Sequence, residues 1–232
     1  ANTTAIFRAG CEAIQQVEQN RNKEIKAVVH FANPEKQNYM TYAKALADAG
    51  VEYDVFASSY YPYWHGTLDN LKNQLNAITE KYGKEVMVAE TSWATGLEDS
   101  DGHANTVREG NNDAGMDYDF SIYGQAKELR EVINAVAEMD KGIGVFYWEP
   151  AWIPVNVYDP EAEDAKQTLA TNKAAWEKYG SGWAASYAKE YDAEDAGKWY
   201  GGSAIDNQAL FDASGHPLET LKIFSYVKTG AE

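Results

Sequence analysis

The sequence is poor in cysteine and has no long apolar run, and both shortages exclude classes of protein. Cys11 is the only cysteine among 232 residues, so no disulfide can form within the chain. It falls on the apolar stripe of an expected helix, and we therefore interpret it as a buried, unreactive thiol. No apolar stretch reaches the roughly 18 residues of a membrane-spanning helix. Cys/His zinc spacings and Gly-rich phosphate loops are also missing, which excludes zinc and nucleotide chemistry.

Basic residues are scarce as well. The chain has 20 Lys and Arg against 36 Asp and Glu, which gives a formal net charge of -16. Such a chain cannot replace the counterions of a nucleic-acid backbone, and an anionic membrane surface would repel it. An uncharged polysaccharide remains compatible with this charge.

Aromatic residues, by contrast, are abundant. The chain contains 7 Trp and 16 Tyr, and it is 44% hydrophobic, so it can bury a substantial core. Large rings serve core packing, and flat ring faces also stack on the apolar faces of sugars. The aromatic excess therefore fits carbohydrate binding, although many of these rings are expected in the core.

Apolar periodicity predicts helices that alternate with short apolar strands. The expected helices cover residues 3–19, 36–49, 67–82, 121–139 and 217–228, and the expected strands cover 27–31, 53–59, 86–90 and 143–148. A long irregular segment is expected at 153–214. This alternation predicts an α/β fold with a parallel sheet and outer helices, in which ligands bind at the carboxyl ends of the strands.

Glu90 ends an otherwise apolar strand, where a carboxylate is unusual and needs an explanation. A structural ion pair is one explanation, and a catalytic nucleophile or base is the other. Glu149 ends the next strand, and glycoside hydrolysis needs a pair of carboxyl groups. However, neighbouring residues of a strand point to opposite faces, so Glu149 points away from any sugar that Trp148 contacts.

Aromatic side chains follow the strands at the same level. Tyr60, Tyr61, Tyr63, Trp64 and His65 form a cluster broken only by Pro62. The cluster is either a platform for sugar rings or an apolar cover for the sheet, and it can be both. From these positions we predict substrate binding by Tyr60, Tyr63, Trp64, His65, Trp93 and Trp148.

The segment Asp99–Asn105 carries oxygen-bearing groups at alternate positions. Asp99, Asp101, His103 and Asn105 could converge on one hard cation, as Ca²⁺ requires. Gly110 occupies the twelfth position, where an EF-hand has its bidentate Glu, so this is not an EF-hand. A solvated polar loop is the alternative.

Four segments together resemble glycoside hydrolase family 53, the arabinogalactan endo-β-1,4-galactanases. They are Ser58–Leu68 (SSYYPYWHGTL), Val88–Thr91 (VAET), Gly144–Trp152 (GVFYWEPAW) and Asp206–Phe211 (DNQALF). The resemblance implies a secreted (β/α)8-barrel enzyme that cleaves internal β-1,4-galactosyl bonds with retention of configuration. It also implies that residues 1–232 form strands five to eight, the C-terminal half of the barrel.

The resemblance further implies roles for single residues. Glu90 is the expected nucleophile at the end of barrel strand seven. Trp148 on strand eight floors the subsite for the attacked sugar. The loop of Asp99, Asp101, His103 and Asn105 looks like the calcium site of bacterial members, with His103 contributing its backbone oxygen.

The sequence departs from the family in one respect. Family members carry the acid/base Glu directly after an Asn on strand four, and no Asn-Glu pair occurs in residues 1–232. We therefore expect this chain to be inactive alone, and the missing N-terminal half or a second copy to complete the barrel. Because the chain begins with Ala1, we expect it to have been processed or cut. The alternatives are a related endo-glycosidase acting on mannan or cellulose, and a non-catalytic sugar-binding fragment.

Overall fold

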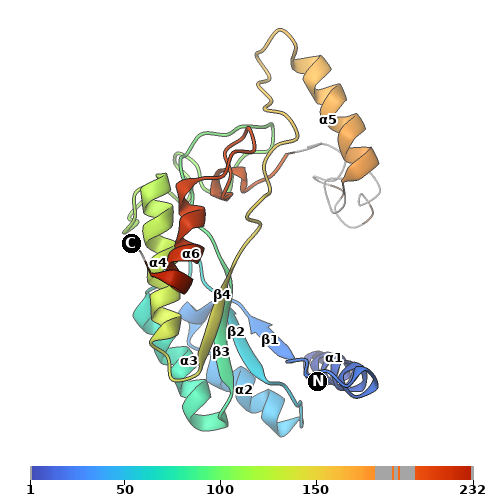
Figure 1. Cartoon of the computed structure of the whole chain (residues 1–232), viewed down its shortest axis with the longest axis vertical. Coiled ribbons are helices and arrows are strands. Elements are labelled where there is room, and N and C mark those ends of the chain that lie inside the picture. Colours follow the sequence, from blue (N-terminus) through green and yellow to red (C-terminus); the bar gives the residue numbers. More distant parts are fainter. Residues whose placement is uncertain (1, 181–189, 191–192, 194–201, 231–232) are drawn as a thin grey trace. The chain divides into compact units, whose positions relative to one another are not determined.

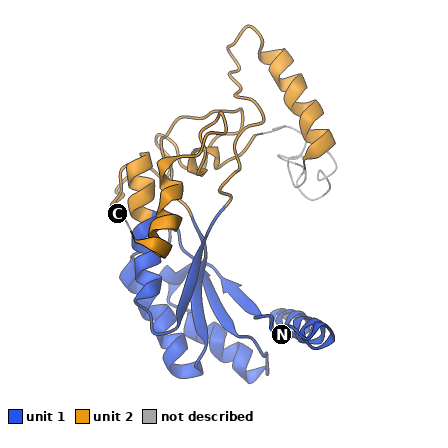
Figure 2. Ribbon diagram, viewed as in Figure 1, with its two compact units in different colours: residues 1–91, 129–148 blue, residues 92–128, 149–232 orange. Residues whose placement is uncertain are grey.

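A computed structural model describes residues 2–180, 190, 193 and 202–230. The chain divides into two compact units, each described by itself (Figure 2). Unit 1 comprises residues 1–91 and 129–148, and unit 2 comprises residues 92–128 and 149–232. No helix in the described part of the chain is long and apolar enough to cross a membrane.

Unit 1 contains a parallel sheet of four strands in the order β1-β2-β3-β4 (Figure 1). The strands are β1 (Val28–Phe31), β2 (Val55–Ser59), β3 (Glu85–Thr91) and β4 (Gly142–Tyr147). Parallel neighbours need a crossover connection, which a helix usually provides. The expected parallel pairing of the four strands is confirmed.

One face of this sheet is covered by helices. They are α1 (Asn2–Arg21), α2 (Tyr39–Asp48), α3 (Leu68–Tyr82) and the second half of α4 (Ile122–Ala137). Leu71, Leu75 and Ile78 recur at helical spacing on α3 and are fully buried against the sheet. Each such side chain contributes about 1.5–3 kcal/mol by leaving water. The core of unit 1 therefore lies between the helices and this face of the sheet.

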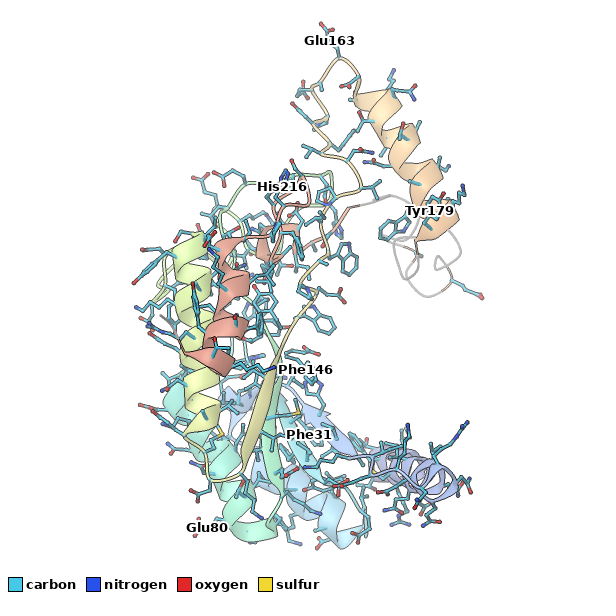
Figure 3. All side chains as sticks on the ribbon, viewed as in Figure 1. Phe31, Glu80, Phe146, Glu163, Tyr179 and His216 are labelled. Atoms are coloured by element: carbon cyan, nitrogen blue, oxygen red, sulfur yellow. The ribbon has the colours of Figure 1, made fainter. Side chains whose placement is uncertain are left out.

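The other face of the sheet carries a much smaller cluster. Val55, Ala57 and Met87 are buried there, with Ala89 packed against them. The outer strands leave apolar side chains exposed on this unit: Val28 of β1 is 45% exposed and Phe146 of β4 is 65% exposed. Phe146 is labelled in Figure 3. The sheet of unit 1 thus has one well-packed face and two strands with exposed apolar residues.

Helix α3 has a well-defined beginning and end. The Thr67 hydroxyl accepts a hydrogen bond from the Asn70 backbone N–H at 3.2 Å. Gly83 follows the last turn with a left-handed φ of 69°, as expected for the residue that ends a helix. This helix matches its sequence prediction because both of its ends are encoded locally.

Unit 2 consists mainly of loops, with the first part of α4 up to Glu128, α5 (Ala165–Tyr179) and α6 (Lys222–Thr229). The expectation of an irregular segment over 153–214 is wrong for α5. This helix has few apolar residues and no clear apolar stripe, and its alanines and lysines have a high helix propensity that does not depend on such a stripe. Within that segment, residues 181–189, 191–192 and 194–201 lie outside the described residues.

Two glycines give a paired test of the helix description. Gly83 has φ +69° and only Lys141 Nζ, at 3.9 Å, near an added Cβ, whereas Gly10 inside α1 has nothing within 4 Å. We expect Gly83→Ala to lower the free energy of unfolding by about 1 kcal/mol through backbone strain. Gly10→Ala should raise it by about 0.5–1 kcal/mol. Urea unfolding followed by circular dichroism measures both, and shifts of the same sign would contradict the assignment.

Candidate active site and metal site

The register of β2 against β3 shifts immediately before Glu90. Ser58 is opposite Val88, but Ser59 is opposite Glu90, so one step along β2 corresponds to two steps along β3. The extra residue in β3 forms a bulge, and bulges re-aim side chains. Strict alternation would place Glu90 with Val86 and Val88 on the helix-covered face. The bulge turns it to the face that Ser59 shares.

Two hydroxyl groups hold the Glu90 carboxylate. The hydroxyls of Ser59 and Tyr61 donate hydrogen bonds to Glu90 Oε2 at 3.0 and 3.2 Å. The second oxygen, Oε1, lies 3.9 Å from Nδ1 of His30, and 24% of the Glu90 side chain is exposed. One carboxylate oxygen is thus fixed, while the other receives no hydrogen bond from the residues that the structure describes.

Hydrogen counting fixes the role of His30. The imidazole Nε2 lies 2.8 Å from Ser59 Oγ. Ser59 has one hydroxyl hydrogen, and an ionised carboxylate only accepts, so that hydrogen goes to Glu90. The His30 Nε2 must therefore carry a hydrogen and donate it to Ser59. His30, Ser59 and Glu90 form a directed hydrogen-bond chain across β1, β2 and β3.

The aromatic cluster divides between packing and the site. Tyr60 is 3% exposed, belongs to the core of unit 1, and donates its hydroxyl to the Gly66 carbonyl at 3.0 Å. Its ring therefore packs in the core instead of facing a substrate, which corrects its predicted role in sugar binding. Tyr61, the next residue, is the aromatic side chain that reaches Glu90.

The remaining cluster residues pack around Tyr61. His65 is buried, and its Nδ1 accepts a hydrogen bond from the Tyr61 backbone N–H at 3.0 Å. Burial lowers the pKa of His65, which keeps the ring neutral. Tyr63 is 9% exposed, whereas Trp64 is 41% exposed and its ring lies 5.5 Å from that of Tyr61. Trp64 is the cluster residue with most ring surface available to a ligand.

The two other tryptophans predicted to bind substrate differ in exposure. Trp148, just after β4, is 40% exposed and donates its backbone N–H to Thr91 O, next to Glu90. Trp93 in unit 2 has no exposed surface, since it stacks on Phe120 and donates Nε1–H to a backbone carbonyl. Trp93 is therefore a core residue of unit 2, which corrects its predicted role in substrate binding.

Three carboxylates meet in the predicted metal loop of unit 2. Oxygens of Asp99, Asp101 and Asp206 lie within 4.8 Å of one another. Asp101 accepts hydrogen bonds from the backbone N–H groups of His103 and Ser203 at 2.6 and 2.8 Å. The structure thus brings Asp99 and Asp101 together, adds Asp206, and places the His103 backbone against Asp101.

Asn105 completes this cluster. It is fully buried, and its Nδ2 lies 2.6 Å from Oδ1 of Asp206. Its Oδ1 is also buried and has no hydrogen-bond partner among the described residues. An unsatisfied buried amide oxygen beside three carboxylates is the arrangement expected where a cation binds.

The electrostatics of the cluster agree with this arrangement. Burial, followed by the neighbouring carboxylates, raises the pKa of Asp101 to about 7. Burial also raises the pKa of Asp206 to about 6, with Asp99 contributing. Without a cation, the cluster resists full ionisation, and a divalent ion would compensate these charges.

Sequence reasoning missed His30, Ser59 and Asp206 as site residues. His30 was the only polar side chain of the expected strand 27–31, which was a usable signal. Ser59 gave no signal apart from its place at a strand end. Asp206 lies 101 residues from its partner Asn105, so no local spacing could connect them.

A carboxylate held by hydroxyl donors at the carboxyl end of a parallel strand, beside an aromatic cluster, is compatible with one of the two carboxyl groups that a glycoside hydrolase on an α/β sheet needs. Comparison with known proteins gives the family. The model of glycosyl hydrolase family 53 matches residues 1–224, and the chain belongs to this family.

Individual relatives support this family assignment. The chain is 52% identical over 227 residues to the endo-β-1,4-galactanase of Bacillus subtilis (strain 168), covering 97% of this chain and 50% of that protein. It is 35% identical over 141 residues to the arabinogalactan endo-β-1,4-galactanase of Humicola insolens, covering 57% and 40%. The Ignisphaera aggregans family 53 catalytic domain superimposes with a TM-score of 0.69 at 35% identity, covering 93% and 49%. The chain therefore spans about half the length of these relatives.

Proposed function

We propose that this chain carries the nucleophile half of a retaining endo-glycosidase that cleaves internal β-1,4-galactosyl bonds of galactan. The observation that carries this proposal is the Glu90 carboxylate, turned by the β3 bulge and held through Oε2 by Ser59 and Tyr61. Family membership supplies the reaction class, and the names of the galactanase relatives support the substrate.

The contacts of Glu90 support different roles for its two carboxylate oxygens. Oε2 accepts both hydroxyl hydrogen bonds, so Oε1 is the atom with a lone pair available for attack. Oε1 bonds to the anomeric carbon while the glycosidic C–O bond breaks and the leaving oxygen takes a proton from a second carboxyl group. Water then attacks the covalent galactosyl–Glu90 ester, gives a proton back to that second group, and releases the sugar with its configuration retained.

The second carboxyl group lies outside residues 1–232 in this proposal. The chain has no Asn-Glu pair, and without an acid the departure of an alkoxide slows by about 10²–10⁴-fold. We therefore propose that the chain is inactive alone. Trp148 and Trp64, both substantially exposed, are the rings that we assign to substrate stacking.

Exchange of Glu90 for Gln tests the nucleophile in a polypeptide that contains the complete barrel. The amide keeps the shape but cannot form the ester, so turnover of β-1,4-galactan should fall below about one thousandth of wild type while binding is retained. Glu85→Gln, at the start of the same strand, is the matched control and should keep activity. Galactan, mannan and cellulose are offered in parallel, and reducing ends are counted. Activity near wild type for Glu90→Gln would reject the assignment.

We propose that the cluster of Asp99, Asp101, Asn105 and Asp206 holds a Ca²⁺ ion, with the His103 backbone oxygen as a further ligand. Converging carboxylates and the unsatisfied Asn105 oxygen support this. The ion would neutralise buried charge and fix the loop, and it takes no part in bond cleavage.

Calcium binding is measured by calorimetry on this chain after chelation. At a hundred times Kd, Ca²⁺ should raise the free energy of unfolding by about 2.7 kcal/mol. Asp101→Asn should abolish binding because it removes a buried charged ligand. Asp212→Asn, an exposed acid of unit 2 outside the cluster, is the control and should bind normally. Binding that survives in Asp101→Asn would disprove the site.

We also propose that the sheet of unit 1 is completed by further strands, from an N-terminal half of the same polypeptide or from a second copy. β1 and β4 end the strand order, and no other strand pairs with them in the part of the chain described. Ile143 and Phe146 leave 46% and 65% of their surface exposed on β4. Free strand edges and exposed apolar side chains together favour association. Because a polysaccharide is too large to enter a cell, we place the enzyme outside it, as a secreted protein.

Light scattering coupled to size-exclusion chromatography tests this completion. The isolated chain should run above its monomer mass of 25.8 kDa, because two open sheets bury each other's edges. Phe146→Lys should weaken this association, whereas Glu80→Lys on the outer helix α3 should not. A stable monomer at all concentrations would contradict completion by a second copy and leave the N-terminal half of the same polypeptide as the source of the missing strands.

A further inference from the structure

We propose that Tyr39, on α2, is a positioning residue for Glu90, acting through Ser58 and Ser59 from the opposite face of the sheet. The inference rests on the proposed nucleophilic role of Glu90. Tyr39 belongs to the helix-covered core, whereas Glu90 lies on the other face beside Ser59. The hydroxyl of Tyr39 therefore reaches the site through the strands, by the Ser58 hydroxyl on β2 and by the Phe31 carbonyl on β1.

Tyr39 and Ser58 are both fully buried, and their hydroxyl oxygens lie 2.5 Å apart. The Ser58 hydroxyl is also 2.8 Å from the carbonyl of Ser59, and the Tyr39 hydroxyl is 3.2 Å from the carbonyl of Phe31. A tyrosine hydroxyl buried in an apolar core needs a partner, and here its shortest contact is a strand residue next to the site.

The two hydroxyls have only two hydrogens for these three contacts. If Tyr39 donates to Ser58, then Ser58 donates onward to the Ser59 carbonyl, and the chain is unbroken. If Tyr39 donates to Phe31 instead, Ser58 donates to Tyr39. If both hydroxyls donated to the carbonyls, two oxygens 2.5 Å apart would face each other with no hydrogen between them, which is repulsive. The bond between Tyr39 and Ser58 is therefore made, and it ties helix α2 to β2.

The place of this bond in the sheet gives it a function. Ser58 is opposite Val88 in the last pair before the register shifts, and Ser59 is opposite Glu90 in the first pair after it. Bulges disrupt the ladder locally. Just beyond the shift the Tyr60 backbone N–H donates to the Glu90 carbonyl at 2.8 Å, and the side-chain bond of Tyr39 to Ser58 adds a second tie there. The bond of Tyr39 to Ser58 fixes β2 at the shift, and the next residue, Ser59, then meets Glu90 and His30.

Simple packing is the competing explanation. The Tyr39 ring lies 5.2 Å from that of Phe56 and 6.5 Å from that of Phe31, and a phenylalanine would keep these contacts. Tyr39→Phe therefore removes the hydroxyl alone. Tyr53 is a matched control, since it is also buried, its ring also lies near Phe56, and its hydroxyl makes no hydrogen bond to any described residue.

The first measurement needs no catalytic activity and uses the chain as it is. With only four histidines in the sequence, the Nε2–H signal of His30 can be assigned in nitrogen–proton spectra with His30→Gln as reference. Tyr39→Phe should shift or abolish this signal because Ser59 moves away from His30, and Tyr53→Phe should leave it unchanged. An unchanged signal in a folded Tyr39→Phe variant would overturn the proposal.

The second measurement uses galactan turnover in a polypeptide with the complete barrel. Tyr39→Phe should lower kcat about five- to tenfold and leave KM within twofold, the loss expected for one hydrogen bond that acts on the nucleophile. Ser58→Ala should lower kcat similarly, and the double variant should be no slower than Ser58→Ala alone. Additive losses, or equal rates in Tyr39→Phe and Tyr53→Phe, would refute the coupling. If the wild-type protein shows no galactan turnover while Tyr39→Phe still changes the His30 signal, the proposed function is rejected and the coupling is kept.

Discussion

The candidate active site depends on the register of β2 against β3, where the step from Ser58 to Ser59 is matched by two residues, from Val88 to Glu90. A strand has a side-chain period of two, so one added residue exchanges the faces of everything that follows it. Val86 and Val88 stay in the core under the helices, and the carboxylate of Glu90 leaves that core. Ionised and unpaired among the valines, it would cost several kcal/mol. On the other face it finds the hydroxyls of Ser59 and Tyr61.

Aromatic residues of the chain have two different duties, and burial separates them. Tyr39, Tyr60 and Trp93 keep almost no exposed surface, and the hydroxyl or indole nitrogen of each lies within hydrogen-bonding distance of a backbone carbonyl. Trp64 and Trp148 keep about two fifths of their surface exposed. A buried ring stabilises the fold through the area it removes from water, and an exposed ring keeps that area for a ligand. The aromatic excess of the composition is therefore divided between buried rings of the core and rings that remain exposed.

Unit 2 is organised by buried polar groups more than by apolar packing. The side-chain amide of Gln125 donates to the carbonyls of Trp93, Gln208 and Ala209, and Asn207 donates to those of Gly96 and Val107. Loops without regular structure need such bonds, because their backbone carbonyls have no ladder partner. The carboxylate cluster of Asp99, Asp101 and Asp206 belongs to the same network, since Asp206 is adjacent to Asn207. A cation there would stabilise loops that have little other means of order.

The sequence by itself determined the four parallel strands, the helices that connect them, and Glu90 as the residue of interest, because these follow from local periodicity and from polar residues at strand ends. For helix α3 the sequence also gives both ends, since Thr67 caps its beginning and Gly83 follows its last turn. Helix α5 was not predicted from the sequence, because its residues favour a helix but form no apolar stripe. Only the tertiary structure decided which face Glu90 occupies, that Tyr61 and not Tyr60 reaches it, that Trp93 is core, and that Asp206 joins Asp101. Each of these depends on a pairing between residues distant in sequence or on a single shift of register, and neither leaves a periodic trace in the chain.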